Sequence, residues 1–182
     1  IRQSADTVKK VSMELGGNAP FIVFDDADLD RAIDGVMASK FRNSGQTCVC
    51  ANRVFVQAGV HDEFVAKLVE KTRALKLGNG MDAGVTQGPL INQAALKKVE
   101  GFVEDAKAKG ATVATGGMRD QLGGTFFQPT ILTGAKADME FAQEEIFGPV
   151  APVFKFETDQ DGIDMANNTR FGLAAYAYTS DL

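Results

Sequence analysis

The chain contains no tryptophan, a single histidine and only two cysteines among its 182 residues. Two cysteines cannot build the disulfide framework of many small secreted domains, so a reducing, cytoplasmic environment is the default expectation. No apolar run approaches the roughly 18 residues that suggest a membrane-spanning helix, and we expect no membrane partner. The net charge of −5 leaves no basic stripe to pair with phosphates, which argues against a nucleic-acid partner.

The remaining composition is typical of a globular protein, with 45% hydrophobic and 24% charged residues. The length is sufficient for one compact domain with a hydrophobic core. The sequence does not begin with Met, and it ends directly after an apolar run at residues 174–178. We therefore expect the chain to be part of a longer protein.

Hydrophobic periodicity and turn residues divide the chain into alternating strands and helices. Helices are expected after the capping residues Asp28, Asp62 and Asn92, and a short fourth helix is expected near residues 161–167. The expected strands are residues 11–15, 21–24, 53–57, 112–114, 126–132, 150–156 and 174–178. This alternation predicts an α/β fold in which a layered, mostly parallel sheet is flanked by helices.

Cys48 is the first candidate for chemistry. A free cysteine is most often a small core residue, but the preceding Gly45, Gln46 and Thr47 form a polar turn that suits a core poorly. Backbone N–H groups in such a turn can stabilise a thiolate and hold a developing oxyanion. These features favour a nucleophilic thiol.

Glu14 is the second candidate, because it leads into Gly16 and Gly17, where a backbone without Cβ atoms can approach a ligand closely. An exposed carboxylate on a strand edge is the alternative interpretation. A thiol nucleophile and a carboxylate base are together the groups needed to form and then hydrolyse a thioester. That pairing of Cys48 with Glu14 is the leading hypothesis.

Cys50 permits two further interpretations. Together with Cys48 and the lone His61 it offers at most three metal ligands at an unusual spacing, so we expect no metal site. An oxidised pair of Cys48 and Cys50 would instead make Cys50 a redox partner that switches the nucleophile off.

Three motifs together resemble the aldehyde dehydrogenase superfamily: residues 14–18 (Glu-Leu-Gly-Gly-Asn), 45–48 (Gly-Gln-Thr-Cys) and 145–149 (Glu-Ile-Phe-Gly-Pro). Their order and spacing are similar to those of the family, with Glu14 and Cys48 34 positions apart (48 − 14). The resemblance implies that residues 1–182 form the thiol-bearing catalytic domain. Most of the cofactor-binding domain and the C-terminal oligomerisation segment would then lie outside the chain, in a protein that forms a homo-oligomer.

The resemblance also implies a mechanism. Cys48 would attack an aldehyde to give a thiohemiacetal, a hydride would pass to NAD or NADP, and Glu14 would activate the water that hydrolyses the resulting thioester. Glu145 would bind ribose hydroxyls of the cofactor, Phe147 would pack near the nicotinamide, and the backbone of Leu15 would help to seat the ring. The isolated chain is expected to show no useful turnover.

Residues 40–53 are similar to the succinate-semialdehyde dehydrogenase branch, including the second cysteine. In that branch the arginine six positions before the nucleophile binds the distal carboxylate of the substrate, and Arg42 occupies this position. A planar guanidinium matches a carboxylate, so the expected substrate is a small anionic aldehyde, either succinate semialdehyde or a similar ω-oxo acid. From the residues alone, a solvated arginine at a helix end is the alternative.

Three other functions remain open. The chain could belong to an aldehyde dehydrogenase for a different aldehyde, although a CoA-acylating member is disfavoured because Glu14 supplies a hydrolytic base. It could be a Cys-His hydrolase that uses Cys48 and His61, or a non-catalytic binding module with an unreactive Cys48.

Overall fold

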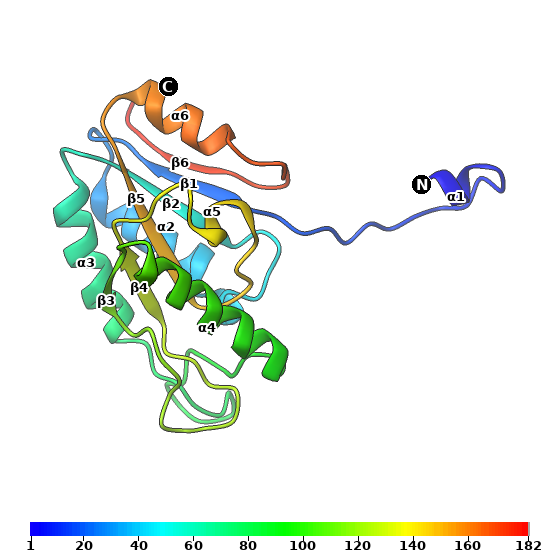
Figure 1. The fold of residues 1–182 in the computed structure, drawn as a ribbon, viewed down its shortest axis with the longest axis horizontal. Helices are drawn as coiled ribbons and strands as arrows, with labels where there is room; N and C mark the ends of the chain where they lie inside the picture. The colour runs from blue at the N-terminus through cyan, green and yellow to red at the C-terminus, as the bar shows by residue number, and fades with distance from the viewer. Residues whose placement is uncertain (182) are drawn as a thin grey trace.

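The computed structural model describes residues 1–181 and is built around a six-stranded sheet with strand order β3-β4-β5-β2-β1-β6 (Figure 1). The antiparallel pair is β3 with β4, and the other neighbouring strands run parallel. The strands are β1 Ala19–Val23, β2 Ala51–Gln57, β3 Thr112–Thr115, β4 Thr130–Thr133, β5 Val150–Phe156 and β6 Tyr176–Tyr178. The predicted α/β class with a mostly parallel sheet is confirmed.

Helices connect and cover these strands, except α1, which lies away from the sheet at the N-terminal end (Figure 1). Their bounds are α1 Arg2–Ala5, α2 Leu29–Lys40, α3 His61–Arg73, α4 Gln93–Ala108, α5 Glu140–Gln143 and α6 Asp159–Asn167, with a short 3-10 helix η1 at Arg42–Gly45. The side chains of Asp28 and Asn92 accept hydrogen bonds from the backbone N–H groups of Arg31 and Ala95, which satisfies two of the free donors at the starts of α2 and α4. Within residues 1–181, no helix has the length and apolar character needed to cross a membrane.

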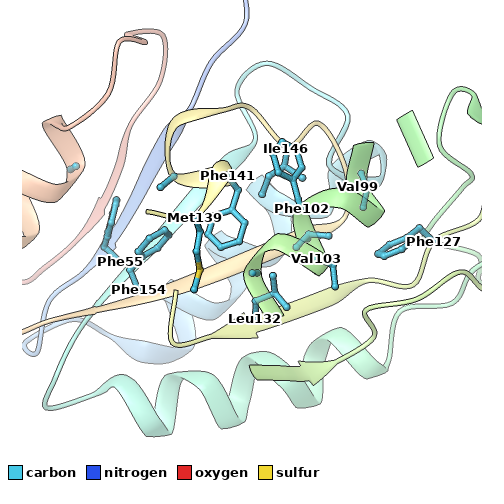
Figure 2. Close-up of a cluster of buried hydrophobic side chains, with 14 of the residues drawn as sticks. Phe55, Val99, Phe102, Val103, Phe127, Leu132, Met139, Phe141, Ile146 and Phe154 are labelled. Atoms are coloured by element: carbon cyan, nitrogen blue, oxygen red, sulfur yellow. The ribbon is translucent and has the colours of Figure 1, made fainter. Parts of the chain in front are cut away.

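The two faces of the sheet carry separate cores, because successive side chains of a strand point to opposite faces. On one face, Val54 and Val56 of β2 pack with the apolar sides of α2 and α3. On the other face, Phe55 packs under α4, α5 and α6. Figure 2 shows this second core, in which Phe102 and Val103 of α4 pack with Phe141 of α5 and Phe154 of β5.

Two local predictions are wrong. Residues 11–15 form no strand, because β1 pairs with its neighbours only from Ala19 onward, and the preceding segment extends away from the sheet toward α1 (Figure 1). Asp62 does not cap α3, which already begins at His61 with Val60 at the N-cap position and no side-chain cap.

The remaining differences concern element bounds. The strands predicted at residues 126–132 and 174–178 begin only at Thr130 and Tyr176, and the helix predicted at residues 161–167 begins at Asp159. The strands predicted to begin at residues 21 and 53 each begin two residues earlier, and the first of them ends at Val23. In that helix the N-cap is Thr158, which exchanges capping-box hydrogen bonds with Asp161.

Candidate active site

The three motifs lie immediately before three strands. Residues 14–18 lead into β1, residues 45–50 lead into β2, and residues 145–149 lead into β5. Because β5, β2 and β1 are parallel neighbours in the sheet, the motifs meet at the amino edge of these strands. Ligands of open α/β sheets usually bind at the carboxyl edge, so the position of this site is unusual for such a sheet.

A cavity of about 410 Å³ opens between the three motifs. Its lining residues are Glu14, Leu15, Gly16, Gln46, Thr47, Cys48, Glu145 and Phe147. A thiol, two carboxylates and an aromatic ring therefore surround one space. The arrangement offers a nucleophile and a base to a single bound molecule.

The turn that carries Cys48 has an unusual backbone. Asn43, Ser44 and Gly45 have φ values of 50°, 53° and 76°, which lie in the left-handed region. Glycine is required at position 45, because a Cβ there would lie 2.1 Å from the carbonyl oxygen of Gly148. Gln46 fixes the far side of the turn by accepting a hydrogen bond from the Ile91 N–H (2.9 Å). The surrounding chain thus imposes the conformation that presents Cys48 to the cavity.

The Gly-Gly turn packs against the other two motifs. A Cβ on Gly17 would lie 2.3 Å from the carbonyl oxygen of Cys48, so only glycine permits this approach. The Gly17 N–H also donates to Oε1 of Glu145 at 3.0 Å. These contacts place the segment that carries Glu14 beside both Cys48 and Glu145.

The aldehyde dehydrogenase family model matches residues 1–182. The chain belongs to the aldehyde dehydrogenase family. It is 58% identical over 182 residues to the 3-sulfolactaldehyde dehydrogenase of Pseudomonas putida, covering 100% of this chain and 37% of that protein. It is also 57% identical over 182 residues to the NADP(+) succinate-semialdehyde dehydrogenase of Escherichia coli K12, covering 100% and 38%.

The crystal structure of the succinate-semialdehyde dehydrogenase from Burkholderia pseudomallei has the same fold, with a TM-score of 0.96 and 58% identity, covering 100% of this chain and 38% of that one. The chain thus spans between 37% and 38% of the length of these three relatives.

One wall of the cavity in this aldehyde dehydrogenase chain suits a ligand with hydroxyls and an aromatic ring. Ile146 is fully buried and anchors the loop, while its neighbour Phe147 remains 37% exposed at a left-handed φ of 53°. Glu145 uses Oε1 for Gly17, and its Oε2 lies 3.1 Å from the Cβ position of Gly16, where glycine leaves space. A carboxylate that accepts hydroxyl hydrogens and an open ring fit the nicotinamide-ribose end of a dinucleotide.

Arg42 is not among the cavity-lining residues, although it begins η1, which leads into the Cys48 turn. Its side chain is exposed, and its positive charge acts on Tyr176 of β6. The Tyr176 hydroxyl donates to the Val49 carbonyl at 2.7 Å. Burial raises the pKa of Tyr176, the nearby Cys50 and Cys48 raise it further, and the Arg42 guanidinium opposes this. The hydrogen bond to Val49 thus ties Tyr176 of β6 to the turn that carries Cys48.

Cys50 lies below the cavity rather than in its lining. Its Sγ is 2.9 Å from Oγ1 of Thr47 and contacts the Arg42 carbonyl at 3.9 Å, and both Cys48 and Cys50 are free thiols. The redox-partner role of Cys50 stays a prediction.

Lys40 is also buried near these groups: desolvation lowers its pKa to about 8, partly opposed by the charges of Cys50 and Glu145.

His61 lies at the other edge of the sheet. Cys48 precedes β2, whereas His61 follows its end, and a seven-residue strand is about 20 Å long. The Cys-His hydrolase interpretation is therefore wrong, because the two side chains cannot share a proton.

Across residues 1–181, no cluster of three or more His, Cys, Asp or Glu side chains could hold a metal ion.

Sequence reasoning missed Lys40 and Tyr176. Lys40 ends an amphipathic helix, where a charged residue is usually solvated, and Tyr176 is in an ordinary apolar strand pattern. Only the long-range packing of β6 and α2 against the Cys48 turn reveals either residue.

Proposed function

We propose that the complete polypeptide that carries this sequence is an NAD- or NADP-dependent aldehyde dehydrogenase, and that residues 1–182 contribute its catalytic portion. The observation that supports this most strongly is the shared cavity of Cys48 and Glu14, with Glu145 and Phe147 on its wall. When bound, the nicotinamide cofactor supplies the acceptor for a hydride. Glu145 and Phe147 would hold its ribose and ring, and the Leu15 backbone would seat the nicotinamide.

Cys48 and Glu14 divide the covalent chemistry between them. The Cys48 thiolate adds to the aldehyde carbonyl, forming a C–S bond and a thiohemiacetal whose oxygen the turn backbone stabilises. Loss of a hydride from that carbon leaves a thioester on Cys48. Glu14 then removes a proton from water as the water attacks the thioester, and the thiolate of Cys48 leaves with release of the carboxylic acid.

The substrate we propose is a small anionic aldehyde, namely succinate semialdehyde or a similar ω-oxo acid. The names of the two relatives both describe aldehydes that carry a second, anionic group. Arg42 is exposed at the start of η1, six positions before Cys48, and we assign its guanidinium to the distal carboxylate. An isolated 182-residue chain is proposed to be inactive, and the complete protein is proposed to be a homo-oligomer.

The test is reduction of NAD or NADP by the complete polypeptide with succinate semialdehyde as substrate. Cys48→Ser should abolish steady turnover, whereas His61→Ala, at the opposite edge of the sheet, should leave it within about twofold of wild type. Unchanged turnover in Cys48→Ser would overturn the proposal. So would loss of turnover in His61→Ala with the fold intact.

A further inference from the structure

Two buried asparagines lie beneath the cavity, one before β1 and one in β2. Asn18 and Asn52 are each 3% exposed, and Nδ2 of Asn52 donates to Oδ1 of Asn18 at 2.6 Å. Each stands four positions after a proposed catalytic residue, Asn18 after Glu14 and Asn52 after Cys48. The pair therefore links the two catalytic segments directly.

Asn52 also holds the loop of the third motif. Its Nδ2 lies 3.2 Å from the Phe141 and Glu144 carbonyls, and its Oδ1 accepts from the Ile146 N–H at 2.9 Å. Glu144 and Ile146 flank Glu145, so one side chain fixes the peptide groups on both sides of that carboxylate. A buried amide with this many partners is difficult to replace.

Asn18 supports the same loop from the β1 side. Its Nδ2 donates to the Ala142 carbonyl at 3.0 Å and to Oγ1 of Thr169 at 3.4 Å. Its backbone carbonyl accepts from Nε and an Nη of the buried Arg53, at 3.2 and 2.9 Å. The residue before Asn18 is Gly17, whose N–H donates to Glu145. A shift of Asn18 would therefore also move a partner of Glu145.

We propose that Asn18 and Asn52 are positioning residues for the dehydrogenase reaction. Neither lines the cavity; the pair holds the Glu14, Cys48 and Glu145 segments in one fixed arrangement, so that cofactor and thiol meet in the geometry that hydride loss needs. This inference rests on the proposed function. A purely structural role would lower stability alone, whereas a positioning role changes cofactor binding and the rate of the hydride step.

The same strand supplies a matched control. Gln57 ends β2 at the opposite edge of the sheet and is also buried, with an exposed fraction of 9%. Its Oε1 accepts from the Asp25 N–H, and its Nε2 donates to Glu157 and Asp159. Gln57→Ala thus removes three partly buried hydrogen bonds from the same strand without touching the three motifs.

The experiment compares Asn52→Ala, Asn18→Ala and Gln57→Ala in the complete polypeptide. We expect similar losses of thermal stability in all three variants. Both asparagine variants should raise the KM for the cofactor about tenfold or more and slow the pre-steady-state burst of reduced cofactor by about 10- to 100-fold, as small displacements of reacting groups do. Gln57→Ala should stay within about threefold of wild type in both values.

Three outcomes would overturn the inference: equal kinetic effects in the asparagine and glutamine variants, wild-type kinetics in both asparagine variants, or failure of both to fold while Gln57→Ala folds. The last result would mean that the pair acts in folding rather than in the reaction. Failure of the proposed function is distinguishable, because the wild-type protein itself would then reduce no cofactor with any aldehyde.

Discussion

Lys40→Met is the single substitution that best tests how a buried charge near this site affects the stability of the protein. Lys40 is completely buried at the end of α2, and its ammonium nitrogen has no hydrogen-bond partner among the described residues. Burial lowers its pKa from 10.5 to about 8, which corresponds to about 3 kcal/mol of destabilisation of the charged form. Methionine has a similar length and carries no charge, so it removes this destabilisation while filling the same space.

The pH dependence of this effect has a definite sign. Below pH 8 the amine is charged in both folded and unfolded chains, so the destabilisation is fully present. Between pH 8 and 10.5 the unfolded chain binds a proton that the folded chain has released, and the stability of the wild type rises with pH. Lys40→Met should therefore raise the free energy of unfolding by about 1–3 kcal/mol at pH 7, and this advantage should shrink by about 2 kcal/mol at pH 9.5.

Urea unfolding monitored by circular dichroism at the two pH values measures both quantities. Lys107→Met is the control, because Lys107 is exposed and pairs with Glu104 three positions earlier on α4; its effect should stay within about 0.5 kcal/mol at both pH values. A Lys40→Met protein that is less stable than wild type at pH 7 would contradict this expectation. So would an advantage that does not change with pH.

Other substitutions test the backbone conformation and the recognition of the substrate. Gly45→Ala should destabilise the protein by about 2–4 kcal/mol in urea unfolding. Gly101 is the control, because it lies in a helix with nothing within 4 Å of its Cβ position; Gly101→Ala should stabilise the protein by about 0.5–1 kcal/mol, and equal effects of the two substitutions would contradict the close contact at Gly45. Asp28→Ala should cost about 1 kcal/mol by removing the cap of α2, measured the same way. Arg42→Ala should lower kcat/KM for succinate semialdehyde by about 10- to 100-fold while leaving a neutral aldehyde such as propanal nearly unaffected, and a uniform loss would argue against carboxylate recognition.

Much of the fold was predictable because its signals are local. Asp28 and Asn92 cap their helices as expected, since a side-chain acceptor before an amphipathic run satisfies free N–H groups wherever the helix packs. The strand at residues 150–156 is confirmed with its predicted bounds. The prediction of a strand at residues 11–15 was wrong because alternating apolar residues form a strand only when another strand lies beside them, and no local pattern can establish that.

The residues of the candidate site also fall into two groups, those with a local sequence signal and those without one. Its chemistry-bearing residues stand in short motifs with unusual glycines, and those glycines are needed where Gly17 and Gly45 meet other backbone segments. The residues that support the site have no such signature. Asn52 and Lys40 are polar residues in elements that bury apolar faces, and their partners or surroundings come from segments distant in the sequence.

In the proposed reaction, Cys48 forms the covalent intermediate and Glu14 activates the water that hydrolyses it. Glu14→Gln in the complete polypeptide, mixed with succinate semialdehyde and cofactor and then analysed by intact-protein and peptide mass spectrometry, tests it most directly. We predict a single burst of reduced cofactor, little further turnover, and a succinyl group attached to Cys48. Full steady turnover in this variant, or an acyl group on any residue other than Cys48, would contradict it.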